Sequence, residues 1–434
     1  MLFDVKNYLF NEISQSIGKE KKTIVVAMSG GVDSSTVAAL LNDIGHKVIG
    51  ITLQLYDHGI AINKKGACCA GIDIYDAQMA AQHIGIPHYV FNYESTFRED
   101  VIIPFADSYI SGKTPIPCIL CNQKIKFRDL LKASVDLNAD YMATGHYISR
   151  KFFDNRYCLY KGIDDHKDQS YFLFSTTQDQ INKSIFPLGS IHKNQTRDLA
   201  KEYGLVVADK SDSQDICFVP NGDYRKIVLD VYPESKKIGE IKFIDGNIIG
   251  THEGIINYTV GQRKGLNISY KEPLYVLEID KVSNTITVGP REFLKKRFIL
   301  VQIINWLDND DWNEYECDVK LRYTQKTTKA RILSLVQFNK LLNENNIQDL
   351  YKDYKNSQFY SEIISNKNIN LNSDYEINPK ISSKMNYIQN NDNNEYNIVI
   401  ELFEDYFGIT PGQACVFYNN DRLLGGGWII SSLQ

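Results

Sequence analysis

The first half of the chain alternates short apolar runs with amphipathic segments of helical period. Strands are expected over residues 21–26, 47–53, 88–91 and 139–146, the last ending in a turn, and helices over 36–41, 73–84 and 121–137. Regular alternation of this kind predicts an α/β fold, a doubly wound parallel sheet with helices on both faces. Ligands of such sheets bind at the carboxyl ends of the strands.

The pattern changes after about residue 220 to short strands separated by turn residues. Residues 239–250 predict a hairpin around Asp245-Gly246, and mostly short strands follow from Phe298. We therefore expect three domains: the α/β domain over 1–222, a small central domain over 223–292 and a C-terminal β-barrel domain over 293–434. Residues 336–396 are rich in Asn, Lys, Tyr and Ser and predict a partly disordered surface insertion without chemistry.

Composition narrows the class of protein. The 434 residues carry 43% hydrophobic residues and a net charge of −5, and no run approaches the length of a membrane span. Residues 1–22 lack the apolar core of a signal peptide, so we expect a cytoplasmic protein without a membrane partner. The negative charge argues against a basic surface, but it does not exclude nucleic acid, because a local groove can still be positive.

A glycine- and serine-rich loop follows the first predicted strand and precedes the first predicted helix. Its residues are Ala27, Met28, Ser29, Gly30, Gly31, Val32, Asp33, Ser34 and Ser35. Glycines at such a turn let backbone N–H groups approach an anion, and the helix N-terminus adds partial positive charge. A plain serine-capped glycine turn is the alternative, which this complete string disfavours. The loop lacks the GxxxxGK[ST] pattern, so it brings no lysine for the β- and γ-phosphates.

Two of the eight cysteine positions lie in settings that suggest chemistry. Cys121 stands at an expected helix start near Lys124 and Lys126, where the helix dipole and the lysines would lower its pKa. Cys217 lies in a polar loop, SDSQDICF, that leads into apolar residues. We interpret the isolated cysteines as inert buried thiols; these are Cys158, Cys317 and Cys415.

These segments together resemble the bacterial tRNA-specific 2-thiouridylases, which belong to the PP-loop enzymes that cleave ATP between its α- and β-phosphates. The matching segments are AMSGGVDSS, CNQKIKF, ATGHY, KDQSYFL, SDSQDICF, GQRKGL, LRYTQ and TPGQACVFYN. They cover almost the whole chain outside 336–396. The resemblance implies a catalytic ATP-binding domain like that of adenine nucleotide α-hydrolases and a tRNA-binding barrel.

The resemblance also implies a reaction. Attack of the carbon-2 oxygen of the wobble uridine on ATP would turn a poor leaving group into an adenylate and release pyrophosphate. Sulfur would then arrive from a persulfide on Cys217. Cys121 would either attack that persulfide to free sulfide or resolve the product as a disulfide with Cys217. The two thiols must meet, so we expect Cys217 on a mobile loop.

Site residues carry over by matched position. The residues from Ala27 to Ser34 with Leu53 and Gly145 would line the ATP site, and Asp33 would help to hold Mg²⁺ or cap the helix. The resemblance assigns tRNA contacts to His146, Lys167, Asp168, Gln169, Arg322, Tyr323 and Gln413. The triplet Ile116, Pro117 and Cys118 would lie near the target base.

That triplet departs from the family, in which many members carry an aspartate at the place of Cys118. Cys118, water or another residue would then have to move the proton during adenylation. The departure also creates a Cys-x-x-Cys pair with Cys121, which together with Cys68 and Cys69 is formally enough for zinc or an iron–sulfur cluster. We do not expect a metal there, because ligation of Cys121 would compete with its role as a nucleophile.

Three other functions stay open. One is a PP-loop amide-forming synthetase, which would need a source of ammonia; a second is an iron–sulfur-dependent tRNA thiolase; a third is a tRNA-binding module without catalysis. For the leading function the expected partners are tRNAs for Lys, Glu and Gln and a sulfur donor protein, either a cysteine desulfurase or a relay carrier. We expect a monomer.

Overall fold

The computed structural model describes residues 2–56, 69–212, 215–219, 222–309, 312, 314–344 and 397–433. The chain divides into two compact units. The first contains residues 1–104, 117–224 and 421–423, and the second contains 105–116, 225–420 and 424–434. Within the described ranges, no helix is both long enough and apolar enough to cross a membrane.

A five-stranded parallel sheet forms the centre of the first unit, with strand order β3-β2-β1-β4-β7. Its strands are β1 (Thr23–Ala27), β2 (Lys47–Gln54), β3 (His88–Asn92), β4 (Tyr141–Ala143) and β7 (Ser184–Ile185). The central strands are apolar along their length, and Ile24, Val25 and Val26 have no exposed surface. Burial of both faces explains why these strands read as continuous hydrophobic runs.

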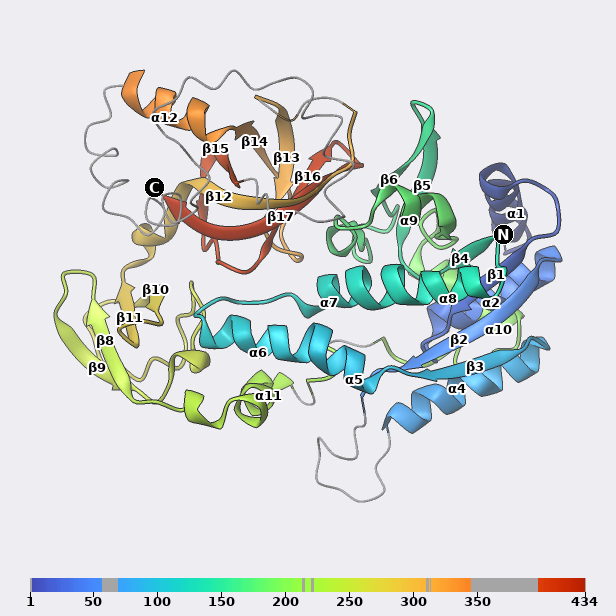
Figure 1. The fold of residues 1–434 in the computed structure, drawn as a ribbon, viewed down its shortest axis with the longest axis horizontal. Helices are drawn as coiled ribbons and strands as arrows, with labels where there is room; N and C mark the ends of the chain where they lie inside the picture. The colour runs from blue at the N-terminus through green and yellow to red at the C-terminus, as the bar shows by residue number, and fades with distance from the viewer. Residues whose placement is uncertain are drawn as a thin grey trace. The chain divides into compact units, whose positions relative to one another are not determined.

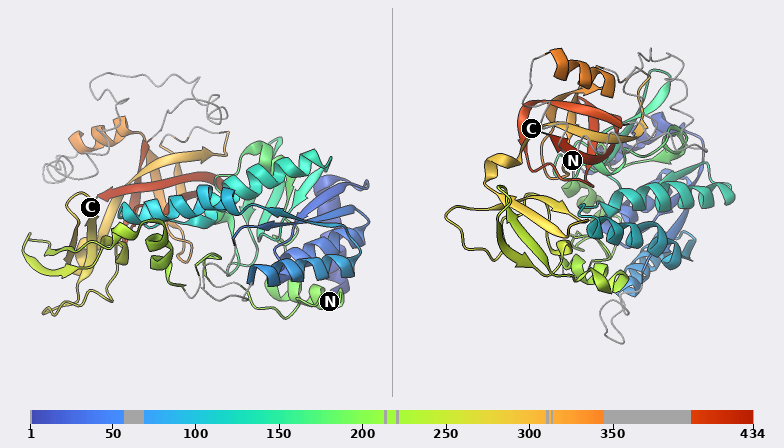
Figure 2. Two further views of the ribbon diagram at one scale, coloured as in Figure 1. Left: turned by 60° about the horizontal axis from the view of Figure 1, so that its bottom comes forward. Right: turned by 60° about the vertical axis from the view of Figure 1, so that its left-hand side comes forward.

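Helices cover both faces of this sheet (Figure 1, and Figure 2, left). One face carries α2 (Val32–Ile44) and α4 (Cys69–Ile84), and α10 (Lys193–Glu202) and α1 (Leu2–Ile17) pack beside them. The other face carries a continuous helical stretch made of α7 (Pro117–Leu120), the π-helical η2 (Cys121–Leu130) and α8 (Leu131–Asp136). The remaining elements of this part of the chain are α5 (Glu94–Phe97), η1 (Arg98–Ile102), α6 (Ile103–Ile110), the hairpin β5 (Ile148–Phe153) and β6 (Arg156–Lys161), η3 (Ser170–Phe172) and α9 (Gln178–Lys183).

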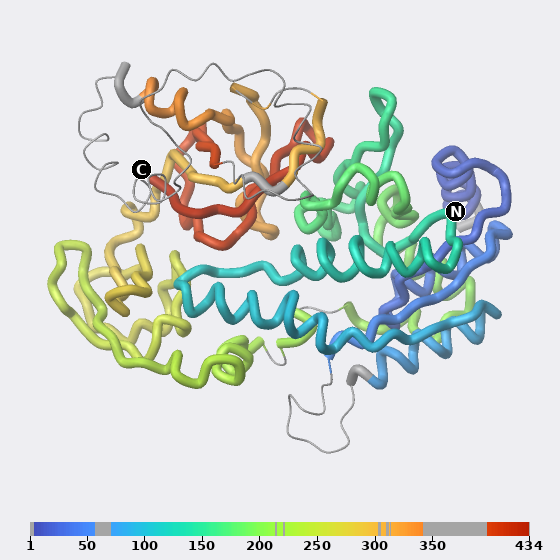
Figure 3. Tube along the Cα trace, in the orientation of Figure 1, coloured from blue at the N-terminus to red at the C-terminus, as the bar shows by residue number. Residues whose placement is uncertain are grey.

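The second unit contains a small four-stranded sheet of order β10-β11-β8-β9. Figure 3 traces the path of this part of the chain in yellow-green to yellow. The strands of the sheet are β8 (Gly239–Phe243), β9 (Ile248–His252), β10 (Tyr275–Asp280) and β11 (Thr285–Gly289). Ile241, Val276 and Ile286 fill its core without exposed surface. The short helices around it are α11 (Tyr224–Val231), η5 (Pro233–Ser235), η6 (Ile255–Asn257) and η7 (Arg291–Leu294).

Six antiparallel strands close into a barrel in the rest of this unit. They run in the order β12-β15-β14-β13-β16-β17, and pairing of β12 with β17 closes the ring. Their bounds are β12 (Lys295–Trp306), β13 (Glu316–Lys320), β14 (Thr328–Leu333), β15 (Asn397–Phe407), β16 (Ala414–Asn419) and β17 (Arg422–Leu433). Closure leaves none of the six with an unpaired edge.

The predicted fold class is confirmed: the parallel sheet, the small sheet after it in the chain and the C-terminal barrel are all present. The predicted hairpin turns at Asp245-Gly246, where Gly246 takes a left-handed φ of 90°. One helix start was wrong. The helix expected from Cys121 begins at Pro117, because proline has a φ suited to the first turn and lacks the N–H that would be unpaired there.

The expected insertion over 336–396 starts too early. Residues 336–344 belong to α12 (Leu335–Glu344), whose Phe338 is fully buried and lies 5.1 Å from Phe298 between ring centroids. This helix therefore belongs to the core of the barrel unit. The rest of the expected insertion, 345–396, lies outside the described residues.

Replacing Phe338 tests whether α12 is part of the barrel's core. Phe338→Ala should lower the free energy of unfolding of the second unit by about 3–5 kcal/mol, because it leaves a cavity against Phe298. All three tryptophans of the chain lie in that unit, so their fluorescence in urea follows its unfolding. Val336→Ala, at an exposed position of the same helix, should change stability by less than about 0.5 kcal/mol. Equal effects of the two would contradict the assignment.

Candidate functional site

The loop after β1 is shaped by one glycine that no other residue can replace without strain. Gly30 has a φ of 71°, and a Cβ there would stand 2.1 Å from the carbonyl oxygen of Asp73. The next residue, Gly31, is the N-cap of α2 and has no side chain with which to cap it. The first-turn N–H groups of α2 therefore need another acceptor, which suits an anion.

Other residues expected at the ATP site gather at the same carboxyl edge of the sheet. The Ser34 hydroxyl accepts the N–H of Ser29 at 3.1 Å, which closes the loop on itself. Gly145 follows β4 and lies against α2, where a Cβ would stand 2.9 Å from the Ser34 nitrogen. Ala27 ends β1, and Leu53 lies near the end of the neighbouring β2. The parallel topology thus brings together segments far apart in the chain.

Asp33 is held by a lysine that the sequence analysis did not identify. The Lys193 ammonium donates to both carboxylate oxygens of Asp33 at 2.7 Å, and the Tyr147 hydroxyl donates to one of them at 2.8 Å. The alternative reading of Asp33 as the helix N-cap is wrong, because Gly31 occupies that position. A cation at Asp33 would have to share the carboxylate with Lys193 or displace it.

A second lysine lies beside the loop. Lys210 donates to the carbonyl oxygen of Gly30 at 3.0 Å and to the carboxylates of Asp73 and Asp76 at 2.7 and 2.6 Å. Partial burial by itself would lower the pKa of Lys210, but these two carboxylates outweigh it and raise the pKa. The motif brings no lysine of its own, so the fold supplies Lys193 and Lys210 from remote parts of the chain.

Asp212, five residues before Cys217 in the chain, contacts three cationic side chains. Lys193 lies 2.9 Å from it, Arg197 donates to it at 2.8 Å and Lys167 at 2.6 Å. Partial burial would raise the pKa of Asp212, but hydrogen bonds from Lys167 and Lys193 outweigh it and hold the pKa at about 2. Asp212 is therefore ionised at neutral pH.

Three free thiols come together in the first unit. Cys118 and Cys121 are three residues apart in one helical stretch, which places them on the same face. Burial, followed by the nearby Cys121 and Cys118, raises the pKa of Cys217 to about 12. The Tyr56 hydroxyl shares a hydrogen bond with Cys217. Cys118 and Cys217 keep exposed surface while Cys121 is 8% exposed, so solvent reaches a thiol cluster that protein atoms crowd.

The expectation of a lowered pKa at Cys121 is wrong. Burial raises the pKa of this thiol, and Lys126 opposes that shift without overcoming it. Cys121 lies beyond the first helical turn, where the dipole is weaker. Lys124 is engaged elsewhere, since it forms an ion pair with Asp100 at 3.1 Å.

Lys126 is the cation shared by the three thiols. It lowers the pKa of Cys118, Cys121 and Cys217 against the effect of burial. Its ammonium also lies 3.5 Å from Nε2 of His146, and burial followed by this charge lowers the pKa of His146 well below its usual value. His146 is therefore neutral, and a Lys126 donor at Nε2 assigns its proton to Nδ1, beside Thr144.

The residues expected to contact tRNA fall into both units. The first unit holds Pro117, Cys118, His146, Lys167, Asp168 and Gln169, and the second holds Ile116, Arg322, Tyr323 and Gln413. Several already have partners within the protein. Asp168 is 4% exposed and accepts the N–H groups of Gly162 and Ser170 at 3.1 Å.

Arg322 and Gln413 also bind neighbouring chain within their unit. The Arg322 guanidinium donates to Thr410 at 2.6 Å, and the Gln413 amide donates to the carbonyl oxygen of Thr114 at 2.9 Å. In the first unit, Gln169 accepts the N–H of Tyr147 at 3.0 Å. These contacts orient the side chains, and their assignment to tRNA stays a prediction.

The other cysteines do not join the thiol cluster. Cys158, Cys317 and Cys415 are buried, as expected of inert thiols, and burial raises the pKa of Cys317 to about 12. Cys68 and the side chain of Cys69 lie outside the described residues. Among the residues whose side chains are described, no three His, Cys, Asp or Glu groups are placed to hold a metal ion.

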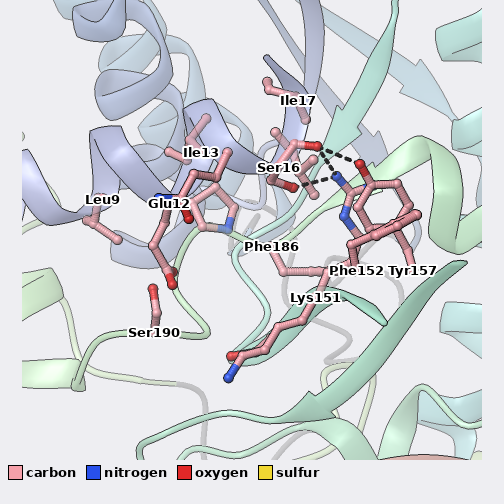
Figure 4. Close-up of a pocket in the computed structure, with 15 residues that line it drawn as sticks. Leu9, Glu12, Ile13, Ser16, Ile17, Lys151, Phe152, Tyr157, Phe186 and Ser190 are labelled. Carbon is pink, nitrogen blue, oxygen red and sulfur yellow. Dashed lines mark hydrogen bonds between the residues drawn. The ribbon is translucent and has the colours of Figure 1, made fainter. Parts of the chain in front are cut away.

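A cavity of about 350 Å³ lies elsewhere in the first unit, between α1 and the β5–β6 hairpin (Figure 4). The Arg150 guanidinium stacks over the Tyr157 ring at 4.0 Å and donates to the Ser16 hydroxyl at 2.6 Å. The lining of this cavity includes neither the loop residues 27–35 nor a cysteine. The cavity is therefore separate from both candidate centres.

Comparison with known proteins now places the chain. Three family profiles match it: a tRNA methyl transferase HUP domain over residues 22–221, a tRNA methyl transferase PRC-barrel domain over 226–290 and an aminomethyltransferase beta-barrel domain over 372–429. Proteins described as tRNA-specific 2-thiouridylase MnmA from Rickettsia massiliae and Rickettsia felis are 45% and 44% identical to it over 421 residues. Each match covers 96% of this chain and 100% of the relative.

A solved structure, described as the U34-tRNA thiolase NcsA from Methanococcus maripaludis with its 4Fe-4S cluster, is a more distant match. It is 20% identical with a TM-score of 0.34, over 54% of this chain and 73% of that chain. A TM-score this low does not support a conclusion about the chain.

Exchange of the two loop glycines tests the shape of the anion site. Gly30→Ala should lower the free energy of unfolding of the first unit by about 1–3 kcal/mol and weaken binding of a fluorescent ATP analogue, because φ is positive and Asp73 blocks the Cβ. Gly31→Ala is the matched control for stability. Its φ is −94° and its Cβ would meet only the Ser29 hydroxyl, at 3.5 Å. Equal loss of stability in both variants, followed by circular dichroism in urea, would contradict this account.

The thiol cluster makes a pH-dependent prediction. Because the pKa of Cys217 is raised to about 12, its thiolate fraction and its rate of alkylation by iodoacetamide should rise about tenfold per pH unit between pH 7 and 10. Mass spectrometry of the Cys217 peptide measures that rate, and a plateau below pH 9 would overturn the prediction. Lys126→Met should slow alkylation of Cys217 relative to the wild type, because it removes the charge that lowers the pKa of this thiol. Lys124→Met should leave the rate unchanged, because Lys124 pairs with Asp100.

Proposed function

Because the chain belongs to the tRNA-specific 2-thiouridylase family, we propose that it is a tRNA sulfurtransferase that replaces the carbon-2 oxygen of the wobble uridine with sulfur at the expense of ATP. The observation that carries this proposal is the meeting of Cys217 with Cys121 and Cys118 in the same unit as the loop at the N-terminus of α2. The loop at the N-terminus of α2 suits the phosphates of a nucleotide, and the three thiols suit the transfer of sulfur.

ATP is proposed to bind with its phosphates at the loop of residues 27–34. The bend at Gly30 and the uncapped start of α2 offer backbone donors, and Lys193 and Lys210 bring positive charge close to them. Leu53 and Gly145 would line the rest of the nucleotide site. Mg²⁺ would accompany the phosphates, and Asp33 can serve it only if Lys193 releases a carboxylate oxygen.

The activation step makes the oxygen a good leaving group. The carbon-2 oxygen of uridine attacks the α-phosphate of ATP, the bond to the β-phosphate breaks, and pyrophosphate leaves. Sulfur then attacks carbon 2, and AMP departs with the former uridine oxygen. A water molecule, another residue or Cys118, which stands where many relatives carry an aspartate, would take up the proton of this stage, and Cys118 can do so only as a thiolate.

The sulfur step balances with two thiols and one sulfane sulfur. A persulfide on Cys217 either releases sulfide when the Cys121 thiolate attacks the Cys217 Sγ, or attacks carbon 2 itself and is cut free by the same thiolate. Both routes form a Cys121–Cys217 disulfide, and the two electrons that the two thiols lose in forming it reduce the transferred sulfur. An external thiol must then reduce the disulfide. Lys126 stabilises the thiolate that either route needs.

The partners follow from this chemistry. The substrates are proposed to be the tRNAs for Lys, Glu and Gln in the cytoplasm, recognised in part by Arg322, Tyr323 and Gln413 of the barrel unit. A cysteine desulfurase or a relay carrier would load Cys217, whose exposed surface makes it reachable. We propose that the enzyme acts as a monomer.

Sulfur transfer accounts for features that other functions leave unused. An amide-forming synthetase with the same loop would have no need for Cys217 beside Cys121 and Cys118. The same holds for a tRNA-binding module without catalysis. The words "methyl transferase" describe the matching profiles, but the relatives that match 96% of the chain are named thiouridylases.

Single cysteine exchanges test the proposal. Cys217→Ser and Cys121→Ser should each reduce formation of 2-thiouridine in tRNA by at least about 100-fold in a reconstituted reaction with ATP and a sulfur donor, since serine can neither carry a persulfide nor form a disulfide. Nucleoside mass spectrometry measures the product. Cys158→Ala, at a buried thiol outside the cluster, is the matched control and should keep wild-type activity. Full activity of either serine variant would refute the persulfide route.

A further inference from the structure

Lys193 links Asp33 to Asp212 through a single ammonium group. It donates to both oxygens of Asp33 at 2.7 Å, and it lies 2.9 Å from Oδ1 of Asp212. Asp33 belongs to the phosphate loop, and Asp212 precedes Cys217 by five residues. The side chain of Lys193 is 11% exposed, so water screens these contacts weakly.

The position of Lys193 is fixed from several sides. Its backbone N–H donates to Asp164 at 3.0 Å, and its ammonium lies 5.7 Å from the centre of the Tyr147 ring. The Tyr147 hydroxyl donates to Asp33 and lies 2.9 Å from the Thr196 hydroxyl, which links Asp33 to the helix α10 that carries Lys193. One ammonium group thus divides its donors between two carboxylates.

The two carboxylates differ in how much they depend on Lys193. Asp212 also binds Lys167 and Arg197, and Arg197 holds the carbonyl oxygens of Ala208 and Lys210 at 2.9 Å. Asp33 has Lys193 as its cationic partner and Tyr147 as its neutral one. A new charge at the loop would therefore act first on Asp33 and Lys193 and would reach Asp212 through them.

We propose that Lys193 couples the occupancy of the phosphate loop to the position of the segment that carries Cys217. Phosphate oxygens at the N-terminus of α2 attract the Lys193 ammonium. A shift of the ammonium toward the phosphates weakens its contact with Asp212. Cys217 then becomes more accessible when nucleotide is present, which times release of sulfur to the moment when the oxygen can be activated.

This inference rests on the proposed function, because it takes the ligand of the loop to be ATP. Thermodynamic linkage makes the coupling reciprocal: a change in the Cys217 segment must alter nucleotide affinity by the same factor. Lys193 is in this sense a positioning residue. The test therefore follows Cys217 itself, in the absence of tRNA and of any turnover.

The experiment measures alkylation of Cys217 by iodoacetamide at fixed pH, with and without a saturating non-hydrolysable ATP analogue and Mg²⁺. Anisotropy of a fluorescent ATP analogue first establishes binding and saturation for each variant. In the wild type, nucleotide should speed alkylation by at least about threefold. Asp212→Asn leaves the phosphate loop intact and removes the carboxylate that competes for Lys193, so by the same linkage it should bind nucleotide about threefold more tightly than the wild type. It should already react fast without nucleotide, and nucleotide should add less than about 1.5-fold.

Two further variants separate coupling from general damage. Lys193→Gln should lose the nucleotide effect on Cys217 even at concentrations that saturate the loop. Lys201→Gln is the matched control on the same helix, since Lys201 is largely exposed and pairs with Asp209, and it should retain the full threefold effect. Circular dichroism verifies that each variant is folded.

The possible failures point to different conclusions. Absence of nucleotide binding to the wild type would contradict the proposed function itself. Saturable binding without a change in Cys217 alkylation would overturn only the coupling. An undiminished nucleotide effect in Asp212→Asn or Lys193→Gln would likewise overturn it, because the route from loop to thiol would then bypass this bridge.

Discussion

The close approach of the Asp73 backbone to Gly30, which leaves no room for a Cβ, is the constraint on which the candidate site depends. The loop after β1 passes directly beneath the backbone of Asp73, and only a residue without a Cβ fits that passage at positive φ. Because the chain turns there, α2 starts with its N–H groups at the carboxyl edge of the sheet. Gly145 makes a second close approach to the same helix start from β4. Two glycines, in the loops that follow the adjacent strands β1 and β4, thus define where an anion can be held.

Charge around this edge is shared among several groups. Lys193 forms ion pairs with Asp33 and Asp212. Lys210 donates hydrogen bonds to Asp73, to Asp76 and to the carbonyl oxygen of Gly30 in the loop. Because these charged side chains are already paired with one another, a bound polyanion would redistribute existing ion pairs. Such a network is weakly screened where it is partly buried, which favours transmission of a local change along it.

At the thiol cluster, burial outweighs the effect of nearby charge on the pKa values. Burial dominates there and keeps Cys118, Cys121 and Cys217 protonated at rest, with Lys126 as the opposing charge. A neutral thiol is a poor nucleophile and a poor target for oxidants, so the resting cluster is protected. Reactivity must then come from events that bring charge or move a neighbour, which is consistent with a reaction in ordered steps.

The sequence by itself determined the parallel sheet and the turn at Gly30, and it made Cys121 and Cys217 the candidate thiols, because periodicity, glycine spacing and local motifs are properties of short segments. It did not determine the pKa of Cys121, the start of its helix at Pro117, or the membership of α12 in the barrel core. Nor did it indicate Lys193, which lies 160 residues from its partner Asp33. Burial and ion pairing depend on which distant segments meet, and only the packed tertiary structure sets that.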